Sequence, residues 1–326
     1  MSVPAPIEEV PAVEVLDPAG EAGIVARSPQ QLFWRRFRQD RFALVSLGFV
    51  VFLVFVALFA PLITSILGLP NPNTQNPNAL DSFGSPSGPS PEHLLGVDQL
   101  GRDVLSRTIY GARVSLEVAF LSTGVAVIIG VTIGMMAAFY GGWTDTLLSR
   151  FMDIVLAFPV LLMAIGLATA CSGQGGCLNG AIQPGLTVLV IVIALASWPY
   201  IGRIVRGQVL SLREMEFVEA SRSLGASNRR IIFKEILPNL VAPIIVYSTL
   251  ILPTNILFEA SLSYLGVGVQ PPTSSWGQMI ADAVPIFDSA WWYMLFPGIA
   301  LVVTVLAFNI VGDGLQDALD PRRNRR

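Results

Sequence analysis

The chain has 326 residues and a formal net charge of −3; 53% of its residues are hydrophobic and only 13% are charged. Because soluble domains carry about 25% charged residues, this composition lacks much of the usual solvated surface. The mean hydropathy is +0.63, and the apolar residues come in long uninterrupted blocks rather than at amphipathic spacing. The small net charge, without a basic patch interleaved with aromatic residues, argues against nucleic-acid binding. The composition therefore predicts a membrane protein.

The residues before the first apolar block divide into two parts. Residues 1–29 are rich in Pro, Ala, Glu and Val without periodicity, which predicts a disordered cytoplasmic tail. Residues 30–41 mix apolar and aromatic residues with Arg, which favours a short interfacial helix. The alternative is a positive flank that only fixes the topology. The block that follows is too long and too late for a cleaved signal peptide, so we interpret it as a retained span.

The apolar blocks predict an all-α membrane protein. A hydrocarbon core about 30 Å thick needs about 20 helical residues, and backbone groups in lipid must be hydrogen-bonded within the segment. Six blocks qualify or come close, of which the third and fourth are short. They are residues 42–63, 118–140, 154–170, 185–201, 240–258 and 291–311. The sequence therefore predicts six transmembrane helices in one transmembrane domain, residues 42–320.

Basic residues set the orientation, because they stay on the cytoplasmic side. With the N-terminus inside, all but three of the 20 Lys and Arg residues are cytoplasmic; the exceptions, Arg102, Arg107 and Arg113, lie just before the second span. Both termini are therefore predicted to be cytoplasmic. The remaining boundaries follow: an external loop at 64–112, a cytoplasmic loop at 203–239 and a basic cytoplasmic tail at 321–326.

The external segments carry two local predictions. In the first loop, the part up to about Pro91 predicts an extended linker, whereas His93–Arg113 regains a helical pattern. A later external segment contains Cys171 and Cys177, which could form a disulfide on the oxidising face or remain free thiols. Two cysteines by themselves cannot make a tetrahedral metal site, and we expect no metal.

The cytoplasmic loop is too long for a minimal connection and predicts a helix–turn–helix. A first helix is expected at Glu214–Leu224, with Gly225 as its C-terminal cap. A second is expected at Arg229–Ile236, capped by Ser227 or Asn228. Pro238 is expected to end this second helix. Residues expected to share a face of the first helix are Phe217, Ala220, Ser221 and Leu224. The alternative is an amphipathic connector that lies on the bilayer.

Two stretches of this loop carry a family resemblance. Residues 219–226 (EASRSLGA), followed by residues 236–239 (ILPN), resemble the EAA loop of bacterial ATP-binding-cassette importer permeases. Glu235 departs from that motif, which has an apolar residue at this position. In the family this loop docks into the ATPase subunit. The resemblance therefore implies a coupling role for Glu219, Ala220, Ser221, Arg222, Leu224, Gly225 and Ala226.

Three further stretches narrow the resemblance to one branch. Residues 93–107 leading into 110–113, residues 259–272 with 275–277 behind them, and residues 309–322 look like signatures of the dipeptide, oligopeptide and nickel permeases. The pattern is similar to that of the C-type permease of this branch, and it extends from about residue 30 onward. The resemblance implies a type I ATP-binding-cassette importer permease fold.

The implied function is transport without enzymatic activity of its own. The chain would form half of a pathway for peptides, or for a related small solute such as nickel, across the inner membrane. The implied partners are a homologous second permease, two ATPase subunits or domains, and an extracytoplasmic solute-binding protein. No phosphate-binding Gly-rich loop with Lys-Ser/Thr occurs here, so we expect the chain to bind no cofactor, with ATP and Mg used by the partners.

Other residues have two interpretations each. Asp98, Arg102, Asp103 and Trp276 are candidate contacts for an external partner; the first three could instead pair with one another. His93, the only His, is expected to anchor its loop rather than to bind metal.

Within the spans, Glu117 and Glu259 are predicted to reach water near the outer ends and to serve packing or capping. Gly124, Gly130 and Gly134 predict close helix packing.

Two other classes of protein would require features that this sequence lacks. An intramembrane enzyme needs a nucleophile and a base at membrane depth, and the spans offer none. An ATP-independent channel or ion-coupled secondary transporter predicts a midplane charge or a broken-helix ion site. Neither feature stands out in the sequence.

Overall fold

The computed structural model describes residues 29–171 and 185–319, and the regular structure in these residues is helical apart from two isolated β-bridges. The predicted disordered tail (its residues 1–28), the basic tail and Cys177 lie outside the described residues. The helices are α1 (Pro29–Phe37), α2 (Arg41–Leu58), α3 (Ala60–Ile66), α4 (Val104–Tyr140), α5 (Gly142–Ala157), α6 (Val160–Cys171), α7 (Leu186–Leu212), α8 (Glu216–Ser223), α9 (Asn228–Arg230), α10 (Leu237–Tyr264), α11 (Trp276–Ala283) and α12 (Trp291–Leu319). Three short segments complete the set: 3₁₀ turns at Pro77–Ala79 and Val284–Ile286, and a π-helical turn, η3, at Ile231–Ile236.

The predicted all-α membrane fold is confirmed. In the described part of the chain, five helices are long and apolar enough to cross a membrane: α2, α4, α7, the continuous helix formed by α9, η3 and α10, and α12. The third predicted span, residues 154–170, corresponds to a bent pair, because α5 and α6 meet at an angle of 86°. Pro159 lies in this break, where its ring prevents a continuous helix.

Several helices are longer than the apolar blocks that predict them. The second span begins at Val104 rather than at residue 118, because Asp103 caps α4: its Oδ1 accepts the backbone N–H of Ser106 at 2.7 Å. The fourth span continues to Leu212, beyond residue 201. Hydropathy marks only the part of a helix that lies in hydrocarbon, so polar helical ends that pack on protein escape it. The first span, in contrast, is divided at Phe59 into α2 and α3.

The first loop is folded rather than an extended linker, and the helical pattern predicted from His93 begins only at Val104. Cross-loop backbone hydrogen bonds hold it; for example, the N–H of Asn76 donates to the carbonyl of Gly101 at 3.1 Å. Gly96 and Gly101 have φ values of +76° and +71°, which keep residues 93–103 from forming a helix. We call residues 67–103 together with α11 the cap.

The closest helix pair in the core is α4 with α7. A Cβ atom built on Gly130 would lie 2.7 Å from the carbonyl oxygen of Trp198, and one on Gly134 would collide with the carbonyl of Gly202. These two glycines therefore permit the predicted close packing. Gly124 does not, because a Cβ there would meet nothing within 4 Å.

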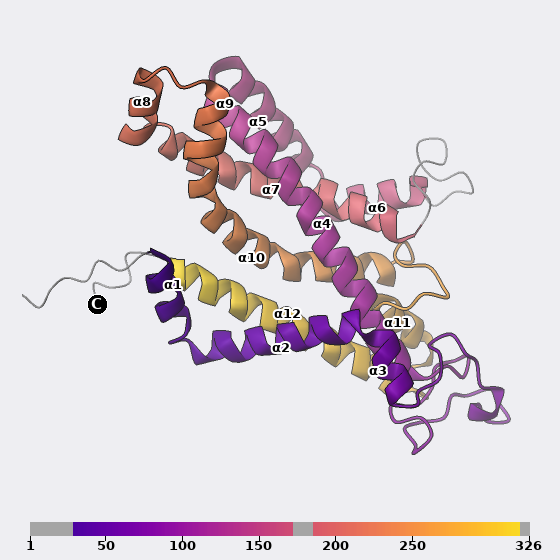
Figure 1. Cartoon of the computed structure of the whole chain (residues 1–326). Coiled ribbons are helices and arrows are strands. Elements are labelled where there is room, and N and C mark those ends of the chain that lie inside the picture. Colours follow the sequence, from indigo (N-terminus) through magenta and orange to yellow (C-terminus); the bar gives the residue numbers. More distant parts are fainter. Residues whose placement is uncertain (1–28, 172–184, 320–326) are drawn as a thin grey trace, which may run out of the picture.

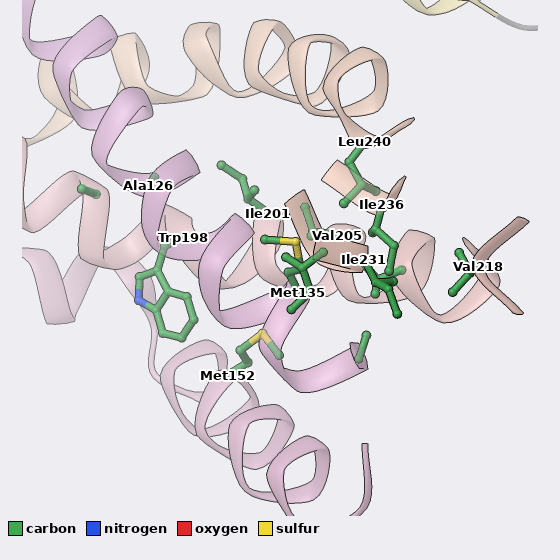
Figure 2. Packing of buried hydrophobic residues seen from close by; sticks show 14 residues of the cluster. Ala126, Met135, Met152, Trp198, Ile201, Val205, Val218, Ile231, Ile236 and Leu240 are labelled. Carbon is green, nitrogen blue, oxygen red and sulfur yellow. The ribbon is translucent and has the colours of Figure 1, made fainter. Parts of the chain in front are cut away.

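The arrangement separates two ends of the molecule. Figure 1 shows α8 and α9 at one end of the long helices and the cap with α3 at the opposite end. Helices α2 and α12 pack side by side, and α1 packs on the C-terminal part of α12 through the buried Phe37. The largest apolar cluster joins α4, α5, α7 and α10. Figure 2 shows this cluster extending from Trp198 to Val218, next to Ile231.

Candidate functional site

The segment that resembles a coupling loop is a short projecting hairpin. Helix α7 ends at Leu212 and α8 begins at Glu216. We call residues 213–227, which contain α8, the coupling segment. At its tip the N–H of Gly225 donates to the carbonyl of Arg222, and that of Ala226 to the carbonyl of Ser221. This pattern is a Schellman motif. Gly225 has φ +77°, so the predicted C-terminal cap is confirmed.

The second helix of the hairpin differs from the prediction. Ser227 caps it as expected, its Oγ accepting the N–H of Arg230 at 3.4 Å. The helix does not end at Pro238 but continues through η3 into α10. The wider π turn closes with the N–H of Leu237 bonded to the carbonyl of Ile232. Pro238 therefore lies inside a continuous helix, at the point where the hydrogen bonding changes from the π turn to the α-helix. The coupling segment is thus joined directly to a membrane span at each end.

One side chain anchors α8, and sequence reasoning missed it. Val218 is fully buried and belongs to the cluster that contains Ile231 and Ile236. The predicted common face of α8 points away from this anchor. Phe217 is exposed, and Leu224 is 89% exposed at the tip. Phe217 and Val218 are adjacent apolar residues of a short helix, and the sequence does not show which of them faces the core.

The seven candidate coupling residues all lie on this hairpin. Glu219, Ala220, Arg222, Leu224 and Gly225 are exposed. Ser221 and Ala226 are half-buried, and Ala226 packs against the core cluster. The arrangement presents a compact knob of small residues with one apolar tip.

At the opposite end the cap holds a buried ionic cluster. Asp98 is fully buried; its Oδ1 accepts the backbone N–H groups of Leu100 and Arg102, each at 2.9 Å. Its Oδ2 accepts the Nε of Arg102 at 2.6 Å and lies 3.5 Å from the Nε of Arg107. The Nη1 of Arg107 donates to the carbonyl of Pro72 at 3.2 Å. One carboxylate therefore joins two arginines to the turn at residues 98–102.

Asp103 pairs with the only histidine. The Nδ1 of His93 lies 2.9 Å from Oδ2 of Asp103, and both side chains are buried. Asp103 also caps α4, so this pair ties the loop to the start of a membrane span. His93 thus anchors its loop, as expected. Of the two aspartates, Asp98 pairs with Arg102, whereas Asp103 pairs with His93. Contact of these residues with an external partner stays a prediction.

Trp276 is buried at the N-terminus of α11. Its indole N–H donates to the carbonyl of Thr108 at 3.0 Å, and its backbone N–H donates to the Oγ of Ser115 at 3.3 Å. The ring rests on Gly111, where a Cβ would approach it to 3.1 Å. Trp276 therefore attaches α11 to α4.

Glu259 corrects a prediction. It is fully buried rather than in reach of water, and it accepts hydrogen bonds from Ser115 at 3.0 Å and from Ser263 at 2.8 Å. These hydroxyls come from α4 and from the end of α10, so the carboxylate has a packing role. Glu117 is exposed, as expected. The sequence placed both residues alike because depth within a bundle is not visible in a single helix.

A second polar cluster was missed altogether. Asn255 of α10 accepts the hydroxyl proton of Ser197 from α7 at 2.8 Å and donates its amide N–H to Thr123 of α4 at 2.8 Å. All three side chains are buried. Such bonds join helices within a membrane. The only sequence signal is a lone Asn in an apolar run between Pro253 and Glu259.

The described residues do not bring together the elements of an enzymatic or metal site. In residues 29–171 and 185–319, no group of three or more His, Cys, Asp or Glu side chains could hold a metal ion. The proposed disulfide includes Cys177, which lies outside these ranges, so it stays a prediction. The expectation that the chain binds no cofactor also stays a prediction.

The fold defines the class of protein. It is similar to that of a subunit of the MetNI methionine ABC transporter in inward-facing crystal forms. One comparison covers 67% of this chain and 96% of the other with a TM-score of 0.53, and a second covers 66% and 97% with a TM-score of 0.55, each at 20% sequence identity. The helical architecture, which in the described residues has five membrane-length helices and one bent pair, is therefore the type I importer permease fold.

The sequence comparisons identify the family to which the chain belongs. Residues 130–325 match the family described as "Binding-protein-dependent transport system inner membrane component", and residues 28–86 match the "N-terminal TM domain of oligopeptide transport permease C". The chain belongs to the family of binding-protein-dependent transport system inner membrane components.

Relatives from several bacteria align over almost the whole chain. The dipeptide transport system permease DppC of Alkalihalophilus pseudofirmus is 42% identical, covering 94% of each chain. The di/tripeptide permease DppC of Pseudomonas aeruginosa is 40% identical, covering 94% of this chain and 96% of the relative. The glutathione permease GsiD of Escherichia coli is 39% identical, covering 91% of each.

Membership of this family shows which class of protein the chain is. The chain is a multi-pass inner-membrane permease subunit of an ATP-binding-cassette importer, and the ATPase of the transporter is a separate subunit. It is therefore not an enzyme by itself, as predicted. An intramembrane enzyme and an ATP-independent channel or ion-coupled transporter are both set aside.

Proposed function

We propose that the chain is the C-type permease of a peptide importer, with di- or oligopeptides, or a closely related small solute such as nickel, as its cargo. The observation that carries this proposal is identity of 39–42% to permeases named for dipeptides, di/tripeptides and glutathione, over at least 91% of the chain. Glutathione is itself a tripeptide. The matched length includes both the cap and the coupling segment.

The complex that we propose contains a homologous second permease, two ATPase subunits or domains, and an extracytoplasmic solute-binding protein. This chain supplies half of the pathway. Large apolar side chains on α4 and α5, such as Ile128 and Trp143, are exposed in the isolated chain. Lipid and a second permease are suitable environments for such a surface.

We propose that the coupling segment docks into the ATPase, with ATP and Mg bound only by that partner. The geometry supports this role. Leu224 exposes 89% of its surface at the tip of a knob whose other end is fixed by Val218. An exposed apolar tip is unfavourable in water and favourable in a partner's cleft. Spans α7 and α10 leave the knob directly, so its displacement moves both.

The proposed orientation places both termini and the coupling segment in the cytoplasm and the cap outside. Its support is the excess of Lys and Arg on the cytoplasmic segments, together with the position of α8 and the cap at opposite ends (Figure 1). We further propose that the cap receives the solute-binding protein. Asp98, Arg102, Asp103 and Trp276 are buried, so they would act by holding the receiving surface in shape.

The coupling proposal is tested with Gly225→Leu. A Cβ atom at this position would meet nothing within 4 Å in this chain, but φ +77° and a docked partner both disfavour a side chain there. We expect uptake of a labelled dipeptide by cells expressing the transporter to be abolished, with the amount of permease in the membrane unchanged.

Gly266, outside both the cap and the coupling segment, offers a matched control. It has φ +80°, nothing within 4 Å, and the same pair of capping hydrogen bonds after α10. Gly266→Leu therefore introduces the same backbone strain away from the coupling segment and should leave uptake within about twofold of wild type. Normal uptake in Gly225→Leu would contradict the docking assignment. Loss of uptake in both variants would attribute the effect to strain.

A further inference from the structure

Helix α5 packs closely against α7. Met152 is buried against Gly202, where a Cβ atom would approach its Sδ to 2.8 Å. Figure 2 shows Met152 reaching toward the α4–α7 core. The ring of Phe151 stacks on that of Trp198 with the centroids 5.6 Å apart. The absence of a side chain at Gly202 thus lets α5 approach α7 to direct contact.

Two ion pairs flank this contact. Arg206 of α7 donates from Nε and Nη2 to the two carboxylate oxygens of Asp145 on α5, at 2.5 and 2.7 Å. Arg203 donates to Asp153 at 2.6 Å. The first pair is bidentate and partly buried, and the second is about half exposed. Because a bidentate Arg–carboxylate pair fixes both distance and orientation, the Asp145–Arg206 pair is the stronger constraint.

The same stretch of α7 leads directly into the coupling segment. Arg213, the first residue after α7, donates from Nη1 to the carbonyl of Ala138, near the end of α4, at 2.7 Å. Only residues 213–215 separate α7 from α8. The corner between α4 and α5 is therefore bonded to α7 close to the segment that would move with the ATPase.

We propose that Asp145 and Arg206 are positioning residues that couple α5 to the displacement of the coupling segment. This inference rests on the proposed docking of that segment. When the segment moves, α7 moves with it, and the bidentate pair makes α5 follow as one body with α7. The 86° break before α6 is the place where the bent span absorbs the movement. Without the pair, α5 retains its apolar contact with Gly202 but loses its fixed orientation.

Partly exposed ion pairs contribute little to folding, so the pair should act on coupling rather than on stability. The test uses the complete transporter in proteoliposomes with its binding protein, and measures uptake of radiolabelled dialanine and ATP hydrolysis in the same vesicles. In Asp145→Asn we expect uptake per ATP hydrolysed to fall at least fivefold, while hydrolysis stays within twofold of wild type. The exchanged pair Asp145→Arg with Arg206→Asp should restore the ratio to within twofold.

Arg150→Gln is the matched control on α5. Arg150 is 78% exposed, and its Nη1 lies 3.6 Å from Asp153, so its loss should not change the ratio. An unchanged ratio in Asp145→Asn, or an exchanged pair as defective as the single variant, would overturn the inference. A wild-type complex without ATP-dependent uptake would overturn the proposed function and this inference with it. A complex that loses transport in Gly225→Leu but keeps normal coupling in Asp145→Asn would overturn the inference alone.

Discussion

Several charged side chains are buried in the cap, whereas those of α8 in the coupling segment are exposed. In the cap, Asp98 and Asp103 are fully buried, and each has a cationic or imidazole partner and backbone donors. In the coupling segment, Glu219 and Arg222 are exposed, and Val218 is the one fully buried side chain that holds α8. Buried charges tolerate no loss of a partner, whereas exposed charges remain solvated. The buried charges of the cap thus have their partners within the chain, whereas the charged side chains of α8 remain exposed.

This difference fits the roles that we propose for the two regions. A surface that receives a binding protein benefits from a fixed shape. A segment that follows an ATPase belongs to the less stable part of a fold, with few buried apolar contacts. The comparison therefore predicts a gradient: substitutions in the cap should affect stability, and substitutions in the coupling segment should affect transport.

The largest effect on stability is expected from Asp98→Ala. It leaves Arg102 and Arg107 buried without their carboxylate, and breaking a buried pair costs about 3–5 kcal/mol. Thermal unfolding of the purified chain in detergent measures this. Glu92→Ala, an exposed residue in the same loop, should leave the unfolding temperature unchanged. Equal stability of the two variants would show that the cap's ionic cluster does not determine its stability.

An intermediate effect on stability is expected where α4 crosses α7, between the cap and the coupling segment. Gly134→Ala places a methyl group against the carbonyl of Gly202, and overpacking costs about 1–3 kcal/mol. Gly124→Ala is the control, because the same helix offers open space there. We expect only the first variant to lower the unfolding temperature in detergent. A loss of the same size in Gly124→Ala would reject the assignment of the close contact to Gly134.

The smallest effect on stability is expected from Leu224→Ser. This side chain is 89% exposed, and exposed substitutions usually change stability by less than about 0.5 kcal/mol. Recovery of the ATPase with the tagged permease from solubilised membranes should nevertheless fall at least fivefold. The exposed Phe83 in the cap, replaced by Ser, is the control and should not alter recovery. Undiminished recovery of the ATPase with Leu224→Ser would remove the apolar tip from the docking surface.

The sequence by itself determined the features that depend on neighbouring residues or on the bilayer. Lipid offers no hydrogen bonds, so each apolar block had to be helical wherever it packs. The C-terminal cap at Gly225 was predicted, and the N-terminal cap was narrowed to Ser227 or Asn228, because such caps are formed by bonds within a few residues.

Only the tertiary structure decided where helices end and which polar groups are buried. The polar first turns of α4 pack against the first external loop, where the side chains of Ser106 and Arg107 donate to the carbonyls of Pro70 and Pro72. Glu259 is buried because Ser115, 144 positions away along the chain, lies beside it. Such pairings join helices that are distant in sequence, and hydropathy or spacing within one helix carries no information about which neighbour it will meet.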